Sequence, residues 1–162
     1  MRKTTLFLVV IFILALIAGV SAQTAKEKLN AKSAITKHIK KEAKSSDAVE
    51  SSANRKIVFG DLDSDGDTDA VVLYGLEGFG GGMDWNQNLA VFLNKKGLFS
   101  FLVEEVVGGK YEGRIVTLPN IKNGRIGLDS YSCGETNPNL CENPKKKRVY
   151  FSLINSKLKE GK

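Results

Sequence analysis

The sequence predicts an α+β fold in which one N-terminal helix is followed by an antiparallel meander of about six or seven strands. A stretch rich in alanine and lysine, with no Gly or Pro, occupies residues 24–46, and short β-prone runs separated by turn residues follow it. No second helical pattern is present to carry a parallel crossover, so neighbouring strands are expected to be antiparallel.

The first 22 residues have the pattern of a secretory signal peptide. Arg2 and Lys3 form a short basic start, and the run from Leu6 to Val20 is apolar or small. Val20-Ser21-Ala22 resembles a signal-peptidase site. The alternative is a membrane anchor, but a spanning helix needs about 20 apolar residues and this run is shorter. We therefore expect residues 1–22 to be cleaved, no membrane span to remain, and the protein to be periplasmic or secreted.

The rest of the chain has the composition of one globular domain. Hydrophobic residues make up 42% and charged residues 26% of the 162 residues, and the formal net charge is +6. We expect an N-terminal helix and polar linker at residues 23–55 and a β domain at residues 56–158. The lysines gather at residues 26–44 and 145–148 with almost no aromatics between them, which argues against a nucleic-acid interface. Residues 145–148 could meet a polyanion or protect an edge strand from aggregation.

The expected helix has a narrow apolar face. Thr24 and Glu27 fit a capping box at its start. The only histidine, His38, lies on this helix among lysines and is interpreted as a solvated or edge residue rather than a catalyst. The apolar positions recur at helical spacing: Ala31, Ile35, Ile39 and Ala43, with Leu29 at the edge. An apolar stripe this narrow indicates a helix that packs against the protein on one side and is exposed to solvent on the other.

The strands are predicted from apolar and β-branched runs that end at turn residues. Asn123-Gly124 between two of them is a strong hairpin signal, because both residues tolerate positive φ. The predicted strands are Lys56 to Phe59, Ala70 to Tyr74, Leu89 to Leu93, Leu98 to Val107, Gly113 to Leu118, Arg125 to Asp129 and Lys147 to Ile154.

An aspartate-rich loop, GDLDSDGDTDA, separates the first two predicted strands. Its carboxylates fall on alternate residues, as a loop wrapped around a cation requires, and Gly66 stands at the sixth position, where the chain must turn sharply. Calcium takes six to eight oxygen ligands, whereas magnesium prefers octahedral sites rich in water. We therefore predict a Ca2+ site whose ligands come from Asp61, Asp63, Asp65, Asp67 (through its carbonyl) and Asp69.

The loop is not an EF-hand, because its twelfth position is Val72 and strands rather than helices are expected to flank it. It resembles the D-x-D-x-D-G-x-x-D strand-loop-strand calcium motif of FG-GAP and VCBS-type repeats, including their FGDLD lead-in. One copy is present, so the propeller of those families is not implied. More loosely, residues 57–158 resemble a class of small exported bacterial proteins, which implies a single exported domain and no particular activity. The calcium is expected to act mainly as a folding ligand.

The two cysteines, Cys133 and Cys141, are separated by seven residues, which include Gly134 and Pro138. An oxidising compartment favours a structural disulfide between them. A redox-active pair is the alternative, but it usually takes C-x-x-C spacing.

A glycine-rich loop from Tyr74 to Asn88 contains the only tryptophan. Aromatic side chains beside amides and carboxylates are typical of a ligand site on a loop. The candidate ligand-binding residues are Phe79, Asp84, Trp85 and Asn86. The alternative is that Trp85 folds back and covers one end of the sheet.

These features favour an exported, non-catalytic binding module, with an envelope polysaccharide or another exported protein as its partner. No catalytic residues are identified. A periplasmic enzyme, or an enzyme inhibitor, that uses the Gly/Trp loop as its working surface remains the alternative.

Overall fold

The computed structural model describes residues 25–132 and 142–161 and confirms the α+β class. Residues 25–45 are helical, and an antiparallel sheet follows. In the described residues this sheet has eight strands in the order of the chain, slightly more than predicted. They are β1 (Val49–Gly60), β2 (Asp69–Glu77), β3 (Trp85–Lys95), β4 (Leu98–Gly109), β5 (Arg114–Lys122), β6 (Arg125–Ser132), β7 (Lys145–Ile154) and β8 (Lys157–Gly161), with a short 3-10 turn, η1 (Phe79–Gly81), between β2 and β3.

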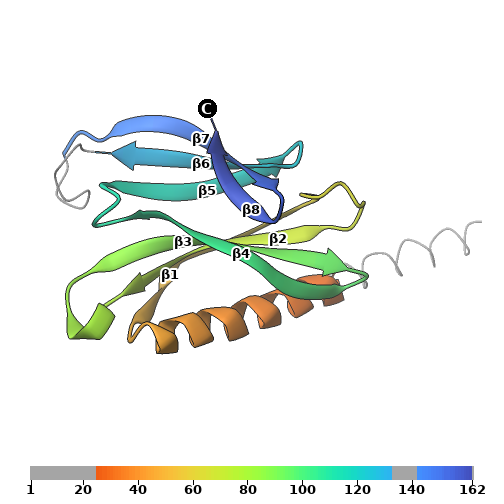
Figure 1. The fold of residues 1–162 in the computed structure, drawn as a ribbon, viewed down its shortest axis with the longest axis horizontal. Helices are drawn as coiled ribbons and strands as arrows, with labels where there is room; N and C mark the ends of the chain where they lie inside the picture. Colours follow the sequence, from red (N-terminus) through yellow and green to blue (C-terminus); the bar gives the residue numbers. More distant parts are fainter. Residues whose placement is uncertain (1–24, 133–141, 162) are drawn as a thin grey trace, which may run out of the picture.

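The sheet folds into two halves of four strands. β4 and β5 are paired only at Gly109 and Arg114, so the ladder bends sharply there. The helix covers the outer face of β1–β4, and β5–β7 lie on the opposite side (Figure 1). The molecule therefore has three layers, with the first half-sheet in the middle.

Two hydrophobic clusters separate these layers, and β2 contributes to both. Val71 and Leu73 point into the cluster between the half-sheets, whereas Ala70, Val72 and Tyr74 point toward the helix. Successive side chains of a strand face opposite sides. A strand buried on both faces therefore reads as a continuous apolar run, which accounts for the run at residues 70–74.

The helix is held by the apolar stripe predicted from its sequence. Ala31, Ile35 and Ile39 are fully buried against β2 and β3, while Leu29 remains 67% exposed. Ile35 and Ile39 are one helical turn apart, so they lie on the same face. Burial of large aliphatic side chains contributes about 1.5–3 kcal/mol each, which is enough to fix a helix that would be marginal alone.

Two segments differ from the predictions. Residues 49–55, expected to belong to a polar linker, form the first part of β1. Val49–Ser51 pair with β2 despite their weak strand propensity, and the register then shifts between Ser51 and Lys56. β8 was not predicted, since it is short and rich in lysine and glutamate and buries only Leu158. It covers the Tyr150–Ile154 part of β7 and leaves the basic start of β7 at an edge of the described sheet.

Two predictions fall outside the described residues: the signal peptide at residues 1–22 and the disulfide between Cys133 and Cys141. Within the described residues, no helix combines the length and the apolar character needed to cross a membrane.

Candidate metal site and a cavity at Trp85

Three carboxylates converge in the loop between β1 and β2. One oxygen from each of Asp61, Asp63 and Asp65 lies within 4.8 Å of the other two, and all three side chains are exposed. The alternation seen in the sequence thus becomes a cluster in space that could hold a metal ion. All of its donors are hard oxygens.

The backbone of the loop folds around these same carboxylates. Asp61 accepts hydrogen bonds from the N–H groups of Ser64 (2.7 Å) and Gly66 (3.2 Å), and Asp65 accepts one from that of Asp67 (2.8 Å). Gly66 has φ +89°, a conformation that is strained for a residue with a side chain. The turn expected at the sixth position of the motif is therefore present.

The last two aspartates of the loop have different neighbours. Asp67 Oδ2 accepts a hydrogen bond from the N–H of Lys96 (3.0 Å). Asp69 is fully buried and accepts one hydrogen bond from the N–H of Leu62 and one from that of Asn94, both 2.9 Å long. Burial raises the pKa of Asp69, although these two hydrogen bonds act in the opposite direction. Among the described residues, the cluster that could bind a metal does not include Asp67 or Asp69.

Through these contacts the loop is connected to the β3–β4 turn, and the turn to the helix. The Asn94 side chain donates to the carbonyl of Thr68 (3.1 Å) and accepts from the N–H of Gly97 (2.7 Å). The carbonyl of Gly97 in turn accepts a hydrogen bond from Asn30 of the helix (2.9 Å). A change in the aspartate loop can therefore affect the β3–β4 hairpin and, through it, the helix, although both are distant from the loop in sequence.

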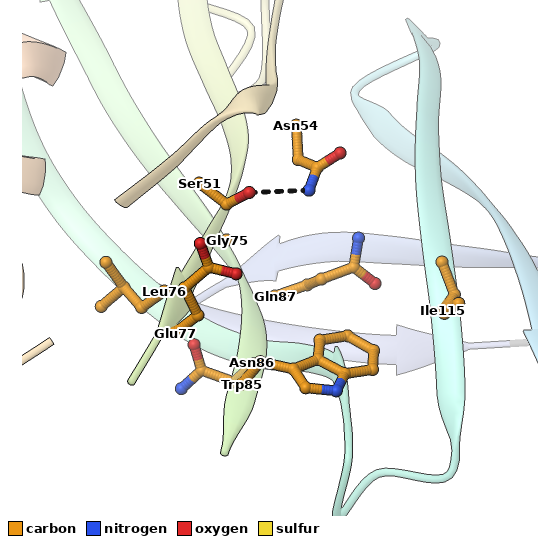
Figure 2. A pocket seen from close by; sticks show the side chains of 9 residues that line it. All are labelled: Ser51, Asn54, Gly75, Leu76, Glu77, Trp85, Asn86, Gln87 and Ile115. Carbon is orange, nitrogen blue, oxygen red and sulfur yellow. Dashed lines mark hydrogen bonds between the residues drawn. The ribbon is translucent and has the colours of Figure 1, made fainter. Parts of the chain in front are cut away.

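A cavity of about 250 Å³ lies at the other end of the same strands (Figure 2). Trp85 lies on one side of it and Ser51 and Asn54 on the other, with Ile115 of β5 completing the wall. Its lining comes from the start of β1, the end of β2, the start of β3 and one residue of β5: Ser51, Asn54, Gly75, Leu76, Glu77, Trp85, Asn86, Gln87 and Ile115.

The structure brings together two of the four ligand-binding candidates from the glycine-rich loop. Trp85 and Asn86 line the cavity. Phe79 packs instead against the cluster beneath the helix, and Asp84 is bound by Lys110 Nζ and the hydroxyl of Tyr111, each at 2.7 Å.

Sequence reasoning did not identify the lining residues Ser51, Asn54 and Glu77. The first two lie in a polar stretch that has no strand pattern, so nothing in the sequence indicated that they would face Trp85.

Gln87 explains how the wall of the cavity is held. Its side-chain amide donates to the carbonyl of Val116 (3.0 Å) and accepts from the N–H of the same residue (2.7 Å). The amide thus replaces a backbone partner where the two half-sheets diverge. A Cβ on Gly108 would lie 2.6 Å from Gln87 Oε1, so a larger residue there would displace the Gln87 amide.

His38 is not a solvated residue, since only 9% of its side chain is exposed. Its Nε2 lies 2.8 Å from Glu104 Oε2, and its ring is stacked on Phe101 with the centroids 4.1 Å apart. Tyr74 donates to the same Glu104 oxygen (2.7 Å). Burial, followed by this hydrogen bond, raises the pKa of Tyr74 far above its usual value. This group fastens the helix to β2 and β4.

Comparisons of the chain with models of known protein families, with curated proteins and with solved structures find no match. The FG-GAP and VCBS-type family is therefore not confirmed. The exposed cluster of Asp61, Asp63 and Asp65 is compatible with a D-x-D-x-D loop.

Proposed function

We propose that this protein is a calcium-binding domain in which the ion stabilises the fold, and that it acts as an exported binding module rather than as a catalyst. The observation that carries the proposal is the convergence of the Asp61, Asp63 and Asp65 carboxylates within 4.8 Å in an exposed loop. Carboxylate oxygens are the ligands that calcium prefers, and the remaining positions of its six to eight would be taken by the Asp67 carbonyl, water and Asp69.

The donor set supports calcium over softer metals. The cluster contains neither histidine nor cysteine, the residues preferred by zinc and copper. It is also open to solvent, and sites of extracellular modules bind calcium with dissociation constants of about 0.1–1 mM. Such an affinity suits the exported location expected from residues 1–22.

A structural role follows from the surroundings of the loop. Three carboxylates held this close repel one another unless a cation lies between them. Asp67 is hydrogen-bonded to the β3–β4 turn and Asp69 to the end of β3, and the turn is hydrogen-bonded to the helix. Binding an ion to the folded loop and not to the unfolded chain would stabilise all three elements.

The test is a calorimetric titration with calcium, combined with thermal unfolding in chelator and in calcium. At about 10 mM calcium, a dissociation constant of about 0.1–1 mM stabilises the folded state by about 1.4–2.7 kcal/mol. The midpoint should then rise by about 3–11 °C. Glu112→Gln, which removes an exposed carboxylate from the turn between β4 and β5, serves as the control and should respond as the wild type does. An unchanged midpoint with no heat of binding would reject the proposal.

A further inference from the structure

The cavity at Trp85 has the composition of a carbohydrate site, and we propose that it binds one neutral sugar unit of a glycan. This inference rests on the proposed binding role, for which it names the ligand, but it does not depend on the ion. The cavity and the aspartate cluster lie at opposite ends of β1 and β2, so each can be tested while the other is disabled.

The first argument is the number of polar groups that remain free to bind a ligand. Within the described part of the chain, the Glu77 carboxylate and the indole N–H of Trp85 have no hydrogen-bond partner. Asn54 uses one donor on Ser51 Oγ (3.1 Å), and its carbonyl oxygen stays free. Ligand sites combine an apolar wall with a few such convergent polar groups.

The second argument is the shape of the wall. The indole of Trp85 extends from β3 toward Ile115 of β5, and together they give the cavity an apolar side opposite Ser51 and Asn54 (Figure 2). A pyranose ring carries C–H groups on its faces and hydroxyls around its rim. It can therefore pack a face against an aromatic ring while its rim bonds to amides and hydroxyls, which both donate and accept.

Size and charge narrow the class of ligand. The volume of about 250 Å³ lies below the roughly 300–1,000 Å³ of sites for drug-sized ligands, so a single ring fits and a longer chain must extend outside. Among the described residues that line the cavity, Glu77 is the only ionisable one, and it is acidic. A carboxylate or phosphate on the ligand would be repelled by it, so neutral sugars are favoured over uronic acids and phosphorylated sugars.

The residues beside the cavity offer a place for a second sugar. Lys110 N–H donates to the carbonyl of Trp85 (3.1 Å), and the next residue, Tyr111, is 79% exposed. The Tyr111 hydroxyl is held by Asp84 (2.7 Å), which limits the motion of the ring. An exposed aromatic held in this way is a second stacking surface, so an oligosaccharide should bind more tightly than a single sugar.

The experiment uses the fluorescence of Trp85, which is the only tryptophan and therefore reports on the cavity alone. The purified protein is titrated with methyl glucoside, methyl mannoside, methyl galactoside and methyl N-acetylglucosaminide, with neutral di- and trisaccharides, and with methyl glucuronide. Each titration is done in calcium and in chelator. We expect saturable binding of at least one neutral sugar and tighter binding of its oligomer by about tenfold. Methyl glucuronide should bind at least about tenfold more weakly than the neutral sugar.

Three variants test the assignment. Asn54→Ala removes an exposed side chain, so the fold should persist, and calorimetry should show binding weakened about five- to tenfold. Asn120→Ala, an exposed asparagine of β5 outside the cavity, is the matched control and should bind as the wild type does. Glu77→Gln should bind the neutral sugar with unchanged affinity and should gain affinity for methyl glucuronide.

The outcomes separate the two proposals. Sugar binding without any effect of calcium on stability would reject the structural ion and keep the carbohydrate site. An effect of calcium without saturable binding of any neutral sugar would reject the carbohydrate site and keep the ion. The carbohydrate site is also overturned if Asn54→Ala binds the sugar like wild type, or if methyl glucuronide is the tighter ligand.

Discussion

The two ends of β1 and β2 differ in how their polar groups are satisfied. At the β1–β2 loop, Asp67 accepts a hydrogen bond from the N–H of Lys96 in the β3–β4 turn, and Asp69 accepts one from that of Asn94 near the end of β3. The cluster of Asp61, Asp63 and Asp65 is left as concentrated negative charge. At the Trp85 end, neutral amides and one carboxylate line an open cavity. One end is thus a closed loop suited to a cation, and the other is an open cavity suited to a larger polar ligand.

The largest effect on this comparison should come from Asp69→Ala. The substitution leaves the buried N–H groups of Leu62 and Asn94 without an acceptor. Because each of the two unsatisfied buried donors costs about 1–3 kcal/mol, we expect the free energy of unfolding in chelator to fall by about 2–6 kcal/mol. Urea denaturation measures it.

Asp67→Ala is the control for this substitution, since it removes one hydrogen bond to Lys96 at the exposed side of the same loop. The free energy of unfolding of Asp67→Ala should fall by no more than about 1 kcal/mol. Equal losses for the two variants would mean that Asp69 does not have the structural role described above.

A slightly smaller loss is expected at the other end for Gln87→Met. Methionine has a similar size but cannot bond to the N–H and C=O of Val116, so the free energy of unfolding should fall by about 2–3 kcal/mol. Hydrogen exchange at the amide of Val116 should become faster. An unchanged rate of hydrogen exchange at the Val116 amide in Gln87→Met would contradict the bridge of two hydrogen bonds from the Gln87 side chain to Val116.

The third prediction separates the ion from the scaffold. Asp63 accepts only a long hydrogen bond from the N–H of Asp65 (3.3 Å), so Asp63→Asn should disturb the loop little. In chelator its stability should equal or exceed that of wild type, because the repulsion is reduced. In about 10 mM calcium it should lose most of the roughly 1.4–2.7 kcal/mol that the ion provides. A variant that is less stable in chelator and still gains from calcium would argue against the cluster as the ion site.

The smallest effect concerns the pH dependence of stability. It comes from the contacts of Asp84 with Lys110 and Tyr111, beside the cavity. Lys110, then Tyr111, lowers the pKa of Asp84 by hydrogen bonding, and Asp84 raises the pKa of Tyr111 in return. A lowered carboxyl pKa gives stability that is present at neutral pH and is lost as the pH falls through the folded-state pKa, below the usual acidic range. A raised phenol pKa gives stability that is lost as the pH rises through it, above about 10.

Asp84→Asn should therefore move the pKa of Tyr111 back toward its ordinary value, which ultraviolet absorption measures during an alkaline titration. Tyr74, whose pKa is raised by its burial under the helix, should still ionise after Tyr111 and serves as the internal reference. A Tyr111 titration that does not change in the variant would show that the contact is absent in solution.

Much of the fold could be predicted because its signals are local. Ile35 and Ile39 lie one turn apart whatever surrounds them, and Asn123-Gly124 makes a tight hairpin, with φ of 51° and 67° at the two residues. The residues that the predictions missed have weak local preferences. The first part of β1 forms because β2 offers it a partner, and β8 because β7 does.

The aspartate loop shows the same division within nine residues. Alternation with a glycine at the sixth position was enough to indicate that carboxylates would converge, because a short loop has few ways to fold. The buried position of Asp69, with backbone contacts to Leu62 and Asn94, was not visible. Asn94 is 25 residues away in sequence, and only the pairing of β2 with β3 brings it there.

The sequence by itself therefore determined the helix and its apolar face, most of the strands, and the aspartate cluster, since each depends on residues within a turn or two of one another. The tertiary structure alone decided the cavity at Trp85, the bridge from Gln87 to Val116, and the burial of His38 against Glu104 and Phe101. Each of these joins segments that are far apart in the chain. Their distances depend on how the two half-sheets and the helix pack, and no local pattern encodes that geometry.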